Sequence, residues 1–357
     1  VRFYIPHRLK EGHGINLSRL DTLINDGVQL ILTCDTGIAE HDAVDHANAR
    51  GVDVIITDHH QLPPVLPKAY AAVNPQRLPR DHPLHTLPGV GCAYKLIEAL
   101  YNRAGYTDEL PAFLDLVALG IVADVAVQTG DARHTLQQGL DVLRQTKRLG
   151  LRALLEIAEI SLERVNEETI GFSIAPRLNA LGRLDDANTA VEFLTTDDEG
   201  RARILANQLD ALNNERKHLS EQVFQAAQVQ VQENPKLLDH AVLVLGHPNW
   251  PGGIIGIVAN RLVEAYNRPV ILLHTPLGEL ARGSARSIPG IDITAAIAAQ
   301  AELLDGYGGH TMAAGLRLPQ ENIIPFRRAI SRTVQSQTTE DRTPTLNIDA
   351  YIPLADV

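Results

Sequence analysis

The stretch VQLILTCDTGIAEHDAVDHANARGVDVIITDHH, residues 28–60, decides the fold of the first part of this chain. Its two ends are apolar runs, 28–35 and 52–58, and each run closes on an aspartate. The residues between them have helical spacing and stop at a glycine. A unit of this size predicts two buried parallel strands that are joined by a right-handed helical crossover.

Acids and imidazoles follow these buried segments. A longer apolar helix, at about 111–123, is expected to deliver one more acid. The five side chains are Asp35, Asp58, His59, His60 and Asp124. Because ligands of a parallel sheet bind beyond the carboxyl ends of its strands, we expect the first two acids to lie close together. Carboxylate oxygens and imidazole nitrogens suit Mn²⁺, Mg²⁺ or Zn²⁺. The alternative is that the aspartates only cap the turns that follow them.

The rest of the chain predicts a second domain of the same class. Helices are expected from a Pro-rich loop to about residue 200, interrupted by the Arg-rich IAPRLNALGRLDD (174–186). A continuous amphipathic helix then leads to a smaller α/β domain. The predicted fold class is therefore α/β, with a parallel-sheet domain joined by a long helix to a smaller domain. The expected limits are 1–200, 201–235 for the connecting helix, 236–336, and 337–357 for the start of a further β unit.

The Arg-rich stretch holds a possible anion site. Arg177, Asn179 and Arg183 surround a glycine, and arginines in this arrangement could grip phosphates in a bidentate manner. They could equally pair with the nearby acids Asp185, Asp186 and Glu192 on a solvated surface.

Two Gly-rich stretches of the smaller domain form a third cluster. RGSARS (282–287) and GGHTMAAG (308–315) let backbone N–H groups approach an anion. Ser284, Arg286 and His310 add side-chain donors, so phosphate binding is expected. The alternative is a pair of tight turns in a small domain.

Three smaller features have plain structural interpretations. The GVG at 89–91 precedes a helix and is typical of a turn, since it is no G-x-G-x-x-G motif. Trp250 could stack on a base, but a lone tryptophan is more often packed. Cys34 is most simply a small buried strand residue.

Composition narrows the class of protein. The formal charge of −11 argues against a generally basic coating for nucleic acid, although local basic patches remain compatible with it. No segment approaches the roughly 18 unbroken apolar residues of a membrane span, so no membrane partner is expected. With two cysteines in 357 residues a disulfide framework is not expected, which predicts a reducing cytoplasm.

Taken in order, several motifs resemble the DHH phosphoesterase superfamily and, within it, the RecJ family. The first domain contributes TCDTGIAEH, TDHHQLPPVLP, LPGVGCAYKL and LDLVALGIVADV. GFSIAPRLNALGRLDDANTAVEFL is similar to the stretch that follows the family's metal-binding core. ARGSARSIPGIDI and GYGGHTMAAGL resemble its DHH-associated domain. The similarity runs from the first residues of the chain to the last.

The resemblance implies a 5′→3′ exonuclease on single-stranded DNA in DNA repair and recombination, which hydrolyses phosphodiesters with two Mn²⁺ or Mg²⁺ ions. It implies that Asp35 bridges the metals and that His59 and Asp124 are ligands. His60 and Asp58 are expected to be catalytic residues, and His60 is expected to contact the scissile phosphate. The resemblance assigns substrate binding to Arg177, Asn179, Arg183, Ser284, Arg286 and His310. A single-strand-binding protein and a repair helicase are implied as partners.

The chain also departs from the family's pattern. The family's first motif, Asp-x-Asp-x-Asp-Gly, should precede Val1 by some two dozen residues, so we expect a truncated chain with an incomplete metal site and impaired cleavage. The C-terminal OB-fold of many members is expected to be cut near its first strand. The family's usual Trp-His-Pro-Gly is here Trp250-Pro251-Gly252-Gly253, which leaves that loop's part in substrate binding open.

Two other functions fit the same residues. Smaller DHH relatives hydrolyse short oligonucleotides or cyclic dinucleotides, although the long helix and the helical region at 140–200 favour the exonuclease. A non-catalytic DNA-binding scaffold is the third possibility. The retention of the full set Asp35, His59, His60 and Asp124 argues against it, because a scaffold has no need of these residues.

Overall fold

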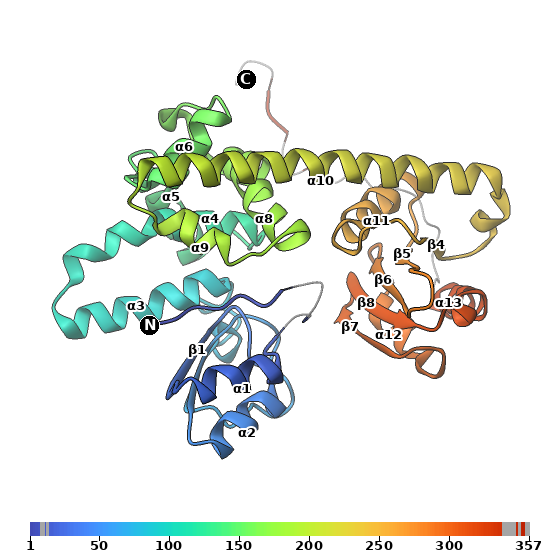
Figure 1. The fold of residues 1–357 in the computed structure, drawn as a ribbon, viewed down its shortest axis with the longest axis horizontal. Coiled ribbons are helices and arrows are strands. Elements are labelled where there is room, and N and C mark those ends of the chain that lie inside the picture. Colours follow the sequence, from blue (N-terminus) through green and yellow to red (C-terminus); the bar gives the residue numbers. More distant parts are fainter. Residues whose placement is uncertain (8–10, 12–13, 338–347, 349–350, 354–357) are drawn as a thin grey trace. The chain divides into compact units, whose positions relative to one another are not determined.

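The computed structural model describes residues 1–7, 11, 14–337, 348 and 351–353. The chain divides into two compact units, Val1–Glu215 and Arg216–Val357, and the division falls inside helix α10 (Glu199–Glu233) (Figure 1). The predicted fold class is confirmed, because the first unit holds a parallel sheet and the second is a smaller α/β domain. The exact domain limits stay predictions, and the β unit expected at 337–357 falls largely outside the described residues.

The sheet of the first unit has the predicted β-α-β connection. Strands β1 (Leu30–Cys34), β2 (Asp53–Thr57) and β3 (Ala71–Val73) lie in the order β1-β2-β3, and both neighbouring pairs are parallel. Helix α2 (His41–Ala49) connects the first two strands, and α1 (Leu17–Asn25) packs beside it. Together these helices and the sheet enclose a small apolar core, in which Val44 and Ile56 are fully buried.

One face of β1 differs from the prediction of a fully buried strand. Leu30 is 55% exposed and Leu32 is 49% exposed, and Cys34 is exposed as well. Successive side chains of a strand point to opposite faces, so Ile31 and Thr33 turn toward the helix-covered core while these three turn away from it. The expectation that Cys34 is buried is therefore wrong.

The remainder of the first unit is helical, and it includes the stretch 174–186 where an interruption was predicted. Residues 170–174 form one π-helical turn that runs directly into α8 (Ala175–Leu184), so that prediction is wrong. Pro176 is the second residue of α8, directly after the π-helical turn, and the helix continues past it. The helices before and after it are α3 (Gly89–Ala104), α4 (Leu114–Ala123), α5 (Gly130–Leu143), α6 (Leu149–Ile157), α7 (Glu167–Thr169) and α9 (Thr189–Thr195).

Helix α10 confirms the predicted continuous helix, within two residues at each end. Asp198 caps its first turn, because its Oδ1 accepts a hydrogen bond of 2.6 Å from the N–H of Arg201. Pro235 follows its last turn. No helix in the described part of the chain has both the length and the apolar character that crossing a bilayer requires.

The second unit is built on a mixed five-stranded sheet. Its order is β4-β5-β6-β8-β7, in which β4 and β5 are parallel and the other pairs are antiparallel. The strands are β4 (Leu243–His247), β5 (Val270–His274), β6 (Ala281–Arg286), β7 (Gly306–His310) and β8 (Ala313–Leu318). The helices are α11 (Gly252–Tyr266), α12 (Ile293–Ala298) and α13 (Ile323–Gln337). Helix α11 packs on β5 and β6.

The Gly-rich stretches of this unit lie mainly in strands, whereas the alternative considered from the sequence was a pair of tight turns. Residues 281–286 are β6, and GYGGH and AAGLRL are the two strands of a hairpin. Glycine serves here for close packing: a methyl group on Gly283 would lie 2.6 Å from Leu273 Cδ2 and 2.7 Å from Leu316 Cδ2. The glycine therefore lets the large side chains of β5 and β8 meet across β6.

Candidate metal centre

The carboxyl edge of the parallel sheet brings the predicted acids and histidines together. Cys34 and Thr57 are register partners at the ends of β1 and β2, so the residues after them leave the sheet side by side. The N–H of Asp35 donates a 2.9 Å hydrogen bond to the carbonyl of Thr57. Asp35 has a φ of 63°, a left-handed conformation that is uncommon for a non-glycine residue. This turn directs its carboxylate to the loop that carries His59 and His60.

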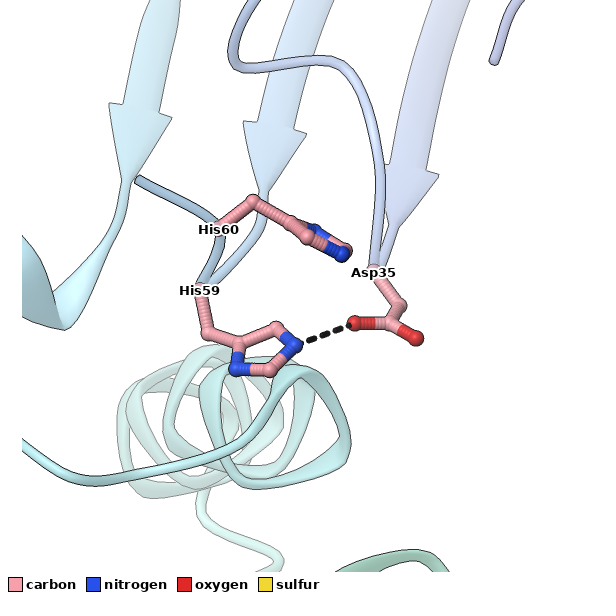
Figure 2. Close-up of side chains that lie close together, drawn as sticks. All are labelled: Asp35, His59 and His60. Carbon is pink, nitrogen blue, oxygen red and sulfur yellow. Dashed lines mark ion pairs between the residues drawn. The ribbon is translucent and has the colours of Figure 1, made fainter. Parts of the chain in front are cut away.

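Three of these side chains form a group that could hold a cation. One ligand atom from each of Asp35, His59 and His60 lies within 4.8 Å of the others, and this is the one such group among the described residues. His59 Nε2 is 3.1 Å from Asp35 Oδ1 (Figure 2). An oxygen and two ring nitrogens at this spacing suit Mn²⁺ and similar borderline ions. The residues present therefore fit a metal ion.

Asp124 borders this group from a different element. It is the C-cap of α4, and its Oδ2 lies 3.6 Å from His59 Nε2. Burial raises the pKa of Asp124, and the nearby Asp35 raises it further, whereas His59 opposes the shift. The prediction that an apolar helix delivers this acid beside the strand-end residues agrees with the geometry.

The two histidines are held by different acids. A hydrogen bond with Asp35 raises the pKa of His59, and the charge of Asp124 adds to the effect although burial opposes it. A hydrogen bond with Asp58 raises the pKa of His60 in the same way. Both shifts show that the surrounding acids favour a positive charge at this point, which is also what a bound cation needs.

Asp58 is placed to orient other residues. It is 1% exposed, and its Oδ1 accepts hydrogen bonds from the N–H groups of His59 (2.8 Å) and His60 (3.2 Å). The same oxygen lies 2.7 Å from His60 Nδ1, while Oδ2 accepts the N–H of Ile38 at 3.0 Å. Burial alone would raise the pKa of Asp58, but these hydrogen bonds lower it on balance. The geometry thus favours a positioning part for Asp58 over the direct catalytic part predicted from the sequence.

The arginine cluster lies on α8, outside the group of ligand atoms. Arg177 forms an ion pair with Asp210 of α10, in which both nitrogen–oxygen distances are 2.9 Å, and it also donates to the carbonyl of Ser173. Its partner is therefore an acid that was not considered from the sequence, since Asp210 lies 33 residues away. Asn179 is exposed, and Arg183 is partly exposed on the last turn of the same helix. The acid Glu192 pairs with Arg201 instead.

The three substrate-binding residues predicted in the second unit lie on one face of its sheet. Ser284 and Arg286 are two residues apart on β6, and Arg286 is paired through Ala313 of β8 with His310 of β7. Ser284 and Arg286 also reach the first turns of α11: a methyl group on Gly256 would lie 3.1 Å from Ser284 Oγ and 3.0 Å from Arg286 Nη2. The pairing of β6, β8 and β7 thus brings these three donors, which come from two separate stretches of the sequence, to the same face of the sheet.

Trp250 and Cys92 offer no reactive surface. Trp250 is 3% exposed, and its ring centroid lies 5.8 Å from that of His247, so it is packed. Burial raises the pKa of the Cys92 thiol to about 12, which leaves it protonated and inert at neutral pH.

Two known domain families match this chain. The DHH family, N-terminal domain, matches residues 1–121, and the DHHA1 domain matches residues 239–336. The first of these ranges contains Asp35, His59 and His60, and the second contains Ser284, Arg286 and His310. Each of the two structural units therefore holds one of the matching domains.

Curated relatives are similar over nearly the whole chain. The single-stranded-DNA-specific exonuclease RecJ of Bacillus subtilis (strain 168) is 38% identical over 359 residues, which cover 100% of this chain and 45% of that protein. The protein of the same name from Escherichia coli (strain K12) is 38% identical, over 94% of this chain and 61% of its own length. The chain thus spans about half of the length of these relatives.

Solved structures agree with the sequence comparison. A crystal structure of exonuclease RecJ bound to manganese aligns with a TM-score of 0.81 and 32% identity, over 93% of this chain and 82% of that one. RecJ from Thermus thermophilus in complex with Mn²⁺ aligns with a TM-score of 0.79 and 31% identity, over 90% of this chain and 47% of that one.

Proposed function

Since the chain belongs to the RecJ family of DHH phosphoesterases, we propose that it is the catalytic part of a metal-dependent exonuclease that hydrolyses single-stranded DNA from its 5′ end. The observation that carries this proposal is the group formed by Asp35, His59 and His60, with Asp124 beside it, at the carboxyl edge of the parallel sheet. Carboxylate and imidazole ligands at such an edge suit the Mn²⁺ or Mg²⁺ ions that phosphodiester hydrolysis uses.

Within the centre, Asp35, His59 and Asp124 would hold the metal. When bound, two such ions supply an activated water and stabilise the leaving oxygen. His60 has a separate task, because Asp58 engages its Nδ1 and turns Nε2 away from the buried carboxylate. A hydrogen bond with Asp58 raises the pKa of His60, and Nε2 of this residue would face a phosphate oxygen of the substrate.

The sheet face of the second unit would bind the DNA strand. Ser284, Arg286 and His310 supply hydroxyl, guanidinium and imidazole donors on one surface, and phosphate contacts of this kind position a strand independently of its sequence. Asn179 and Arg183 on α8 stay proposed contacts. Arg177 is a weaker candidate for a DNA contact because Asp210 already holds it.

The proposed biological process, partners and location rest on the resemblance to the RecJ family. We propose a part in DNA repair and recombination in the cytoplasm, together with a single-strand-binding protein and a repair helicase. These partners and this location stay predictions.

A cleavage assay tests the proposed activity. With Mn²⁺, the protein is expected to shorten a 3′-labelled single strand progressively from its 5′ end, and EDTA should stop the reaction. The same strand with its 5′ end sealed in a hairpin is the control, and cleavage of the hairpin at the same rate would contradict exonuclease action.

The same assay separates the two alternative functions. A short oligoribonucleotide or a cyclic dinucleotide that is hydrolysed faster than the long strand would favour a small-substrate phosphodiesterase. Binding of single-stranded DNA with neither cleavage nor Mn²⁺ binding would favour a scaffold.

Arg286→Ala tests the proposed DNA-binding face. The variant is expected to bind single-stranded DNA about 5- to 10-fold more weakly, because one phosphate contact is lost. For the same reason, the slope of the logarithm of the association constant against the logarithm of the salt concentration should fall in magnitude by about 1. Fluorescence anisotropy of a labelled strand at several salt concentrations measures both. The matched control is Arg332→Ala, which removes an exposed arginine of α13. Equal effects of the two substitutions would show that only net charge matters.

A further inference from the structure

The first turn of α3 makes an unusually close approach to Asp35. Helix α3 begins at Gly89, which is buried. A methyl group on Gly89 would lie 2.2 Å from Asp35 Oδ1, 2.6 Å from its Cγ and 2.7 Å from its Cβ. Real side chains do not come this close, so residue 89 has room for a hydrogen atom only. The GVG stretch that the sequence suggested to be a plain turn thus borders the candidate metal centre.

Asp35 could not relieve such a contact by rotating its side chain. Rotation about the Cα–Cβ bond moves Cγ and the oxygens, but it leaves Cβ in place. The position of Cβ is set by the backbone, and the N–H of Asp35 is bonded to the carbonyl of Thr57 at the end of β2. Any larger residue at position 89 must therefore displace the backbone of Asp35 or the start of α3.

We propose that Gly89 is a positioning residue of the metal centre. By allowing the start of α3 to press directly on Asp35, it confines that carboxylate to the place where Oδ1 lies 3.1 Å from His59 Nε2. This rests on the proposed function in one respect, namely that Asp35 and His59 bind a metal ion.

Gly91, two residues further along α3, provides a matched control. A methyl group there would lie 2.4 Å from Leu87 Cγ and 2.7 Å from its Cδ1. Leu87 belongs to a small apolar cluster with Cys92 and Ala132. These leucine atoms belong to a flexible side chain that can change rotamer, so Gly91→Ala strains the same helical turn without moving a candidate ligand.

Binding of Mn²⁺ measures the effect on the centre. The electron paramagnetic resonance signal of free Mn²⁺ gives the dissociation constant without any need for catalysis. Gly89→Ala is expected to weaken binding about 10- to 100-fold, the range found when residues that orient ligands are lost. Gly91→Ala should stay within about threefold of the original protein. Equal losses in the two variants, or no loss in Gly89→Ala, would overturn the proposal.

A folding experiment tests the contact independently of metal. Asp35→Gly removes all three atoms that the added methyl would meet, and glycine adopts the φ of 63° readily. Gly89→Ala is expected to lower the midpoint of thermal unfolding by about 3 °C or more in the original protein, and by clearly less in the Asp35→Gly background. An equal drop in both backgrounds would show that the contact with Asp35 does not matter.

The two experiments keep the proposals apart. If the original protein binds no Mn²⁺, the proposed metal centre is refuted, and with it the positioning of a ligand. The unfolding experiment in the two backgrounds still shows whether Gly89 and Asp35 are in energetically important contact. If Mn²⁺ binds, and Gly89→Ala lowers the unfolding midpoint equally in both backgrounds, the metal centre stands but Gly89 does not position it.

Discussion

Asp35→Asn is expected to lower the affinity of the protein for Mn²⁺ by about 100-fold or more. An asparagine side chain at this position would keep the shape of the aspartate but lose the negative charge beside His59, whose Nε2 lies 3.1 Å from Asp35 Oδ1. Loss of a residue that merely orients a ligand costs about 10- to 100-fold in metal affinity, so loss of a charged ligand should cost at least as much. Isothermal titration with Mn²⁺ measures the change.

Asp53→Asn is the matched control for this experiment. Asp53 is an exposed aspartate at the opposite end of β2, where its register partner is Leu30 at the start of β1. The substitution removes the same charge from the same sheet at a distance from the strand ends, and it should leave Mn²⁺ binding unchanged. An Asp35→Asn variant that binds Mn²⁺ as tightly as Asp53→Asn would rule out Asp35 as a ligand.

Asp58→Asn is expected to destabilise the protein by about 2 kcal/mol or more, because it leaves a buried donor without an acceptor. Both carboxylate oxygens of Asp58 accept backbone N–H groups, Oδ1 from His59 and His60 and Oδ2 from Ile38. Either orientation of an asparagine amide would set its NH₂ group against one of these donors. Denaturant unfolding followed by circular dichroism measures the loss.

The same substitution should lower the pKa of His60. In the original protein the hydrogen bond with Asp58 raises this pKa above its ordinary value, and a neutral asparagine removes that effect. A titration of the imidazole resonances by NMR in EDTA would show the shift. Asp45→Asn, at an exposed position of α2, is the control and should change neither stability nor the pKa of His60. If Asp58→Asn changes neither the free energy of unfolding nor the pKa of His60, Asp58 does not position His60.

The hydrophobic periodicity of the sequence was sufficient to predict those helices and strands whose formation depends on their own residues. The run at 28–60 predicted two parallel strands with Asp35 and Asp58 at their ends, and the long helix was predicted to within two residues. The strand positions of the Gly-rich stretches were not predicted because glycine favours turns locally, whereas Gly283 lies in a strand to make room for Leu273 and Leu316. Helix α8 was missed because the Arg-rich stretch 174–186 was interpreted as an interruption between helices.

The sequence by itself predicted which residues could bind a metal, and it predicted that Asp35 and Asp58 leave neighbouring strands at the same edge of the sheet, because parallel strands present their carboxyl ends there. Only the tertiary structure decided the finer assignments. It engages Asp58 with His60 and Ile38, pairs Arg177 with Asp210, places His310 across β8 from Arg286, and sets Gly89 against Asp35. Each of these depends on distances of a few ångströms between segments that packing brings together, and no local pattern in the sequence encodes such distances.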